Sequence, residues 1–201
     1  DEVVFPVLTP LAVDPGRPFP HISNLSVNLA ILVRNPQGEE KFARLKVPDT
    51  LPRLVPIKRS SGAVRKDGTI PFNHYFVWLD QLIMANLQAL FPGMEIVSAH
   101  LFRIVRDADI EIQELEADDL LETMQQNIRR RKFGSVVHVS IYDTMPVELR
   151  NLLIENLEVD HNDLYVLQSP LDLSCLWQLY NNIERHDLKY PHYSPYVPKV
   201  F

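Results

Sequence analysis

The residue types that most often do chemistry are few in this sequence and lie far apart. The single cysteine, Cys175, lies among leucines with no histidine close to it in sequence, which favours a structural thiol over a nucleophile. The 7 histidines form no i, i+3 or i, i+4 pair of the kind that presents two metal ligands on a helix. Asp107-Ala108-Asp109 resembles half of a carboxylate or metal site, but a turn or bulge in a strand is the simpler interpretation. We therefore predict no catalytic residue and no metal site.

Phosphate-binding loops are also missing from the sequence. The chain has 6 glycines, and they form neither G-x-G-x-x-G nor G-x-x-x-x-G-K, the patterns that wrap backbone N–H groups around phosphates. We therefore expect no cofactor-binding residue in this chain.

Two groups of basic residues remain as candidates for binding. The run Arg129-Arg130-Arg131-Lys132 follows an expected helix, where complementing the helix dipole explains it better than contact with a polyanion. The second group surrounds an expected hairpin loop in which only Asp67 offsets it, and it is the better candidate for contact with an anion or an acidic neighbouring domain. We call this group the basic cluster, and its members are Arg53, Lys58, Arg59, Arg65 and Lys66.

Length and composition limit the function classes. A chain of 201 residues that is 46% hydrophobic can bury a substantial core. The net charge of −6 argues against general attraction to nucleic acid or to an anionic membrane. We see no signal peptide and no apolar run of the roughly 18 residues that a membrane span needs. A lone cysteine fits a reducing compartment, so we expect a cytoplasmic protein.

The hydrophobic pattern centres on a strand–helix–strand unit. Residues 96–105 are rich in β-branched and aromatic side chains, residues 117–128 carry an apolar stripe at helical spacing, and residues 137–141 alternate as a half-buried strand. Before this unit, residues 27–33 and 42–47 read as a hairpin, and residues 54–58 and 70–77 as a second one at a sheet edge. The proline-dense residues 6–20 predict an entry loop without regular structure.

Three further helices and a short strand complete the prediction. Residues 79–90 carry an apolar stripe that Pro92-Gly93 ends, and Pro146 suits the first turn of a helix with leucines at 149–157. A strand at 165–167 precedes a last helix with Ser169 as N-cap. We expect this last helix to turn four side chains inward, namely Leu173, Leu176, Trp177 and Tyr180. Together the elements predict an α+β fold with a mixed, largely antiparallel sheet and helices packed on it.

Ordered matches along the whole chain carry a family resemblance. They include Leu51-Pro52-Arg53, Leu90-Phe91-Pro92-Gly93 and Pro170-Leu171-Asp172-Leu173-Ser174. Further matches, in chain order, are residues 5–15, 18–26, 28–30, 42–48, 102–109, 129–131, 133–134 and 187–191. In these stretches the chain closely resembles the bacterial polyphosphate kinase family. It departs from the family pattern at Trp78, where proline is expected, and at His138, where arginine is common.

The resemblance implies a middle, or head, domain with a fold grouped with the phosphohistidine phosphatase-like proteins. In that family a small helical domain precedes this region, and two catalytic domains resembling phospholipase D follow it. Those later domains hold the phosphorylated histidine, the arginines that bind the ATP phosphates and the magnesium site. On this basis residues 1–188 form the head domain, and the Pro- and Tyr-rich residues 189–201 form a linker towards the catalytic domains.

The whole enzyme of that family transfers the terminal phosphate of ATP to polyphosphate through a phosphohistidine, with ATP and magnesium as its cofactors. The resemblance therefore implies that this chain is a non-catalytic scaffold and dimerisation surface. Its partners would be the other domains and a second subunit, and its location cytoplasmic or peripheral at the inner membrane. A polyphosphate-binding module that uses the basic cluster is the alternative. A phosphatase is a third hypothesis, resting on analogy of fold alone.

Overall fold

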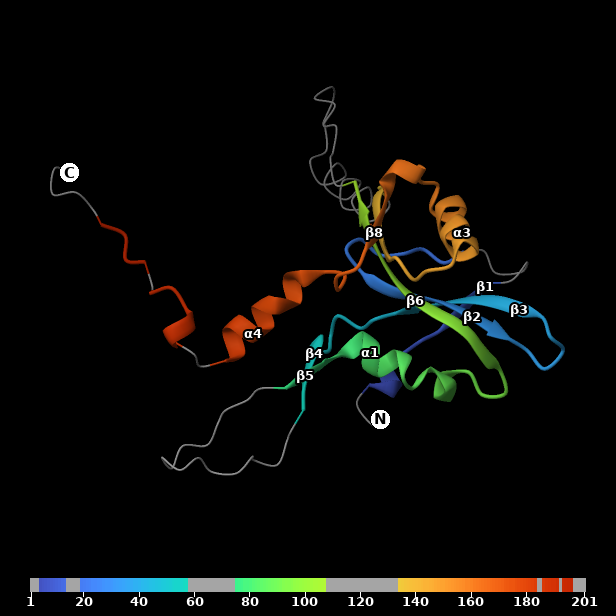
Figure 1. The fold of residues 1–201 in the computed structure, drawn as a ribbon, viewed down its shortest axis with the longest axis horizontal. Coiled ribbons are helices and arrows are strands. Elements are labelled where there is room, and N and C mark those ends of the chain that lie inside the picture. Colours follow the sequence, from blue (N-terminus) through green and yellow to red (C-terminus); the bar gives the residue numbers. More distant parts are fainter. Residues whose placement is uncertain are drawn as a thin grey trace, which may run out of the picture.

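A six-stranded sheet forms the centre of the computed structural model, which describes residues 4–13, 19–57, 75–107, 134–183, 186–191 and 193–196 (Figure 1). The strand order is β1-β3-β2-β6-β7-β8. All neighbouring strands are antiparallel except β7 and β8, which are parallel. The strands are β1 (Leu11–Val13), β2 (Val27–Arg34), β3 (Glu40–Lys46), β6 (Glu95–Arg106), β7 (Val136–Tyr142) and β8 (Leu164–Leu167). The predicted α+β fold with a mixed, largely antiparallel sheet is confirmed.

The first predicted hairpin is formed by β2 and β3. Leu29 lies opposite Leu45, and Ile31 lies opposite Ala43. The Asn35 side chain closes the turn, because its Oδ1 accepts hydrogen bonds from the backbone N–H groups of Gln37 and Glu39 at 3.0 and 2.9 Å. Such side-chain bonds to the following backbone are the reason that asparagine favours turns.

Each face of the sheet is covered by different elements, which produces two apolar cores. The first core packs α1 (Leu79–Met84) and the short 3-10 helix η2 (Leu87–Leu90) against β2, β3 and β6. The second packs α3 (Val147–Leu157) against β6 and β7, where Phe102 and Leu153 are 0% exposed. Because both faces are covered, the sheet buries side chains from consecutive positions of the same strand, as with Leu101 in the first core and Phe102 in the second.

The helices agree with the predicted stripes but differ in length. The predicted helix over residues 79–90 is divided into α1 and η2 at Asn86, where the backbone leaves helical geometry with φ −121°. The Asn86 side-chain amide donates a hydrogen bond to the Leu82 carbonyl oxygen at 2.8 Å, next to this break. The predicted stripe still points inward, since Leu79, Ile83 and Leu87 are buried. Helix α3 is present with its leucine stripe, but Pro146 is its N-cap rather than a residue of its first turn.

The proline-dense entry is more regular than the sequence predicted. A 3-10 turn, η1 (Phe5–Val7), contains Pro6, and the three-residue strand β1 follows Pro10. Strand β1 pairs only with β3 and lies at the sheet edge. The prediction of no regular element over residues 6–20 was therefore wrong. A three-residue strand fits between the prolines, and because it lies at the sheet edge it needs hydrogen bonds on one side only.

The second hairpin and the central helix are described only in part. Strands β4 (Leu54–Pro56) and β5 (Phe76–Trp78) pair as a separate two-stranded sheet, which confirms the hairpin. The residues between them from 58 to 74 lie outside the described residues. The same holds for the predicted helix over residues 117–128 and the run Arg129–Lys132, whereas the two strands predicted to flank that helix form β6 and β7.

The last helix differs from the prediction in its cap and in the face it exposes. It consists of the 3-10 turn η4 (Leu173–Cys175) followed by α4 (Leu176–Asn182), and Asp172 rather than Ser169 caps it by accepting the Ser174 N–H at 3.2 Å. Helix α4 extends away from the sheet (Figure 1). The four side chains predicted to point inward are instead exposed, namely Leu173, Leu176, Trp177 and Tyr180.

The remaining 3-10 turns are η3 (His161–Asp163) and η5 (His186–Leu188). None of the helices in the described parts of the chain is long and apolar enough to cross a membrane.

Candidate functional site

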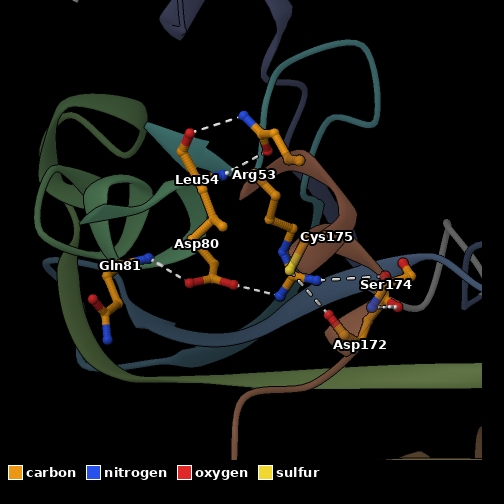
Figure 2. A network of polar contacts seen from close by, with 8 residues as sticks. Arg53, Leu54, Asp80, Gln81, Asp172, Ser174 and Cys175 are labelled. Carbon is orange, nitrogen blue, oxygen red and sulfur yellow. Dashed lines mark hydrogen bonds and ion pairs between the residues drawn. The ribbon is translucent and has the colours of Figure 1, made fainter. Parts of the chain in front are cut away.

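A buried polar network joins three segments that are far apart in the sequence (Figure 2). Arg53 lies just before β4, Asp80 lies in the first turn of α1, and Asp172 caps η4. The Arg53 Nη2 donates to Asp80 Oδ2 at 2.5 Å, and its Nη1 lies 3.6 Å from Asp172 Oδ2. The side chains of Arg53 and Asp80 are only 11% and 5% exposed, so this is a buried ion pair rather than a surface one.

Other groups around the network hold its members in place. Asp80 Oδ1 accepts the backbone N–H of Gln81 at 2.8 Å, so both carboxylate oxygens are engaged. The Trp78 ring centre lies 5.8 Å from the Arg53 guanidinium, within the range of a cation–π contact. Asp172 has φ +62°, in the left-handed region that aspartate tolerates better than most residues. The network therefore pairs the buried Arg53 charge across the β4–β5 hairpin, α1 and η4, with one hydrogen bond to Asp80, while Arg53 Nε and Nη1 have no hydrogen-bond partner among the described residues.

A side-chain amide attaches α4 to the same hairpin. Gln178 Oε1 accepts the backbone N–H of Leu54 at 3.2 Å, and Gln178 Nε2 donates to the Leu54 carbonyl oxygen at 3.0 Å. Gln178 therefore bonds both backbone groups of one residue of β4, as a neighbouring strand would. This contact orients α4 relative to the network.

The Cys175 thiol lies next to the network and is partly buried. It donates a hydrogen bond to the backbone oxygen of Asp172 at 3.3 Å. Burial raises the pKa of Cys175, and the opposing effect of Arg53 is smaller. A thiol that stays protonated is a poor nucleophile, so the structure supports the structural role that the sequence favoured.

A cavity of about 190 Å³ adjoins the network. Its walls include Trp78, Asp80, His100 and Tyr142. Burial lowers the pKa of His100, to which Arg150 adds, and burial raises the pKa of Tyr142. Both side chains are therefore neutral near pH 7, and the Asp80 carboxylate is already bound to Arg53. In the described part of this wall, the groups do not form the nucleophile, base and orienting partner that covalent catalysis requires.

Comparison with known proteins places the chain in a family. The family described as "Polyphosphate kinase middle domain" matches residues 1–179. The chain belongs to this family. It is 47% identical over 196 residues to "Polyphosphate kinase 1" of Chlorobaculum tepidum, covering 97% of this chain and 27% of that protein. It is 45% identical over 204 residues to "Polyphosphate kinase" of Mycolicibacterium gilvum, covering 100% of this chain and 26% of that protein.

A solved structure shows the same fold. The crystal structure of polyphosphate kinase from Porphyromonas gingivalis matches 98% of this middle domain and 26% of that chain, with a TM-score of 0.64 and 21% sequence identity. The present chain thus spans about a quarter of the length of the polyphosphate kinases it matches. The resemblance read from the sequence is confirmed.

Of the five residues predicted to contact an anion or partner, only Arg53 lies within the described part of the chain. Arg53 lies in the buried network of this middle domain, where Asp80 neutralises it, so its side chain is turned away from solvent. The other four members of the basic cluster lie outside the described residues, and their contacts stay a prediction. They are Lys58, Arg59, Arg65 and Lys66.

The ion-pair network was not predicted from the sequence. Arg53 and Asp172 both lie in stretches that carry the family resemblance, which is the one signal that could have drawn attention to them. Hydrophobic periodicity assigns residues to faces of elements, and it does not pair charges that only the tertiary fold brings together.

Of the predicted Asp107-Ala108-Asp109 feature, the structure describes only Asp107. Asp107 follows β6, and its backbone N–H donates to the Ser135 carbonyl oxygen at 2.8 Å, whereas Ala108 and Asp109 lie outside the described residues. In the described segments, no three His, Cys, Asp or Glu side chains gather as metal ligands.

Proposed function

We propose that this chain is the non-catalytic head of a polyphosphate kinase, acting as a scaffold and as a dimerisation surface. The parent enzyme would transfer the terminal phosphate of ATP to polyphosphate through a phosphohistidine, with magnesium, in the cytoplasm. One observation carries the proposal: the match to the polyphosphate kinase middle domain extends over residues 1–179, while the relatives are nearly four times as long. Residues 1–188 would be the head and residues 189–201 the linker to the catalytic domains.

The buried network supports a scaffold role. Arg53, Asp80 and Asp172 connect a hairpin, a helix and the cap of a later helix, and the Arg53 guanidinium contacts both carboxylates. The second subunit and the neighbouring domains are the partners this role implies.

Incubation with labelled ATP tests the proposal. We expect this chain, with ATP and magnesium, to acquire no label on a denaturing gel, while the parent enzyme acquires an acid-labile label under the same conditions. A stable acid-labile label on this chain would contradict the scaffold role, because it would require a phosphate acceptor among its own residues.

The basic cluster offers a second candidate function, contact with polyphosphate. Four cations lie in the segment between β4 and β5 with Asp67 as the only acid, which favours a polyanion or an acidic domain. We favour assembly and expect Arg59→Gln, Arg65→Gln and Lys66→Gln together to weaken dimerisation of the parent enzyme. A raised KM for long polyphosphate with the oligomer intact would instead support substrate binding.

A further inference from the structure

We propose that the outward apolar face of η4 and α4 is the docking surface for another domain of the same polyphosphate kinase polypeptide. The inference rests on the proposed function, because it takes the chain to be the head of a longer enzyme. It goes further by assigning one surface to one partner.

The surface is a regular stripe rather than scattered exposure. Its members are Leu173, Leu176, Trp177 and Tyr180, which we call the α4 stripe. They follow the i, i+3, i+4, i+7 spacing of one helix face, and their exposed fractions are 53%, 43%, 65% and 44%. Single exposed apolar residues are normal in a soluble protein, but a complete helical face of them marks an interaction site.

The opposite face of α4 is already attached to the domain. Gln178 binds both backbone groups of Leu54, and Asp172 at the start of η4 lies beside Arg53. The Trp177 and Tyr180 rings also contact each other edge to face, with centroids 5.4 Å apart. These contacts fix the position of the stripe before any partner binds, and this lowers the entropic cost of docking.

The area of the stripe favours a tethered partner over a second copy of the chain. At roughly 200 Å² for a large side chain, the exposed fractions amount to about 400 Å². A stable complex of separate molecules buries about 800 Å² on each partner. A domain on the same polypeptide needs much less, because the linkage gives it a millimolar effective concentration.

The matched polyphosphate kinases are long enough to contain such a domain. Roughly three quarters of each matched polyphosphate kinase lies outside the region that this chain covers. Exposed aromatic residues also continue beyond α4, where Tyr190 and Tyr193 are 94% and 79% exposed. Tryptophan and tyrosine are typical anchors of interfaces, because each offers a large apolar surface and one hydrogen-bonding group. The partner surface is therefore an apolar patch with hydrogen-bond acceptors.

Hydroxyl-radical labelling read by mass spectrometry tests the docking in the full-length enzyme. We expect labelling of Trp177 to be about fivefold or more slower there than in the 201-residue chain, because docking would place it in an interface core. Val147 is the matched control, since it is 61% exposed on α3 and outside the stripe, and its labelling should not change. Equal labelling of Trp177 in the two proteins would overturn the proposal.

Dilution separates a tethered domain from a second copy. Protection that persists when the enzyme is diluted to monomers supports the proposal, and protection that disappears with the dimer contradicts it. In the full-length enzyme, Leu176→Glu with Trp177→Glu should speed proteolysis between domains about tenfold and leave the sedimentation coefficient of the oligomer unchanged, while Val147→Glu changes neither. Protection of Trp177 in a protein that makes no polyphosphate would support the docking and contradict the proposed function.

Discussion

The sheet with its two cores and the unit built from β4, β5, η4 and α4 are held by different forces. In the sheet, apolar side chains cover both faces and the central ones, such as Phe102 and Ile104, have no exposed surface. In the second unit, which we call the hairpin–helix unit, β4 still buries Leu54 and packs Val55 against the first core, but an ion-pair network and a glutamine amide add polar contacts, and the apolar face of α4 points outward. The comparison shows that an amphipathic pattern can turn its apolar face into the core in one region and towards solvent in another.

The two kinds of contact differ in what they contribute. Burial of apolar area is non-directional and supplies most of the free energy of folding. A buried ion pair often adds little net stability, but removing one partner is costly and its geometry is specific. The sheet therefore provides stability, and the hairpin–helix unit provides the direction in which α4 leaves the domain.

The largest effect is expected in the second core. Leu153→Ala should reduce the free energy of unfolding by about 2–5 kcal/mol, because Leu153 is 0% exposed and a cavity would remain. Val147→Ala on the same helix should change it by less than about 0.5 kcal/mol, since Val147 is exposed. Urea midpoints of the two variants measure the difference. Equal shifts would show that α3 does not pack on the sheet as described.

Breaking the ion pair should have the next largest effect. Among the described residues, Asp80→Leu leaves the buried Arg53 with Asp172 at 3.6 Å as its one acidic partner, and it should cost about 3 kcal/mol. Replacing both partners, with Arg53→Met and Asp80→Leu, should recover much of that loss, because no unpaired charge is then buried. The four proteins of this double-mutant cycle can be compared by urea unfolding. A double variant as unstable as Asp80→Leu alone would contradict the claim that charge pairing, rather than packing, holds this unit.

Removing the glutamine contact should loosen α4 without affecting the sheet. Gln178→Ala loses both hydrogen bonds to Leu54 and should cost about 1 kcal/mol, visible as faster amide hydrogen exchange in α4 and unchanged exchange in β6. Asn181→Ala, at an exposed position of the same helix, is the control. Faster exchange in β6 as well would mean that the two regions unfold as one unit.

The smallest expected effect concerns an ionisable group of the sheet. Burial lowers the pKa of His138 on β7, and the neighbouring Arg103 adds to this. Between that lowered pKa and the ordinary value near 6.5, the unfolded chain binds more protons than the native one, so stability falls as the pH falls through this window. His138→Gln should make that fall shallower, and His161→Gln, at an exposed position, should not. Urea midpoints at about pH 7.5 and about pH 5.5 test this, and equal slopes for all three proteins would contradict it.

Local patterns predicted the elements of the sheet better than the contacts of the hairpin–helix unit. Alternation identified β2 and β3, and Pro146 with the leucine stripe located α3, because in these cases the pattern and the packing have the same local cause. The stripe of α4 was found as well, but its direction was not. Helical periodicity shows that Leu173, Leu176 and Trp177 share a face, and it does not show whether that face meets its own domain or another.

The candidate site was the least predictable part, for a related reason. Arg53 was singled out by its charge as a member of the basic cluster and a candidate for contact with an anion or an acidic domain, whereas the fold buries it against Asp80. The presence of several basic residues near one another in the sequence does not indicate which of them pairs with a carboxylate from a distant helix. The ion pair is a property of the tertiary structure alone.

Fluorescence of Trp177 in the 201-residue chain most directly tests the central claim, that α4 turns its apolar face away from its own domain. The chain has 2 tryptophans, and Trp177 is 65% exposed. Subtracting the spectrum of the Trp177→Phe variant from that of the unmodified chain isolates the emission of Trp177. We expect this component to be red-shifted and quenched by acrylamide almost as strongly as free indole. A blue-shifted component that acrylamide hardly quenches would place Trp177 inside the domain and contradict the account.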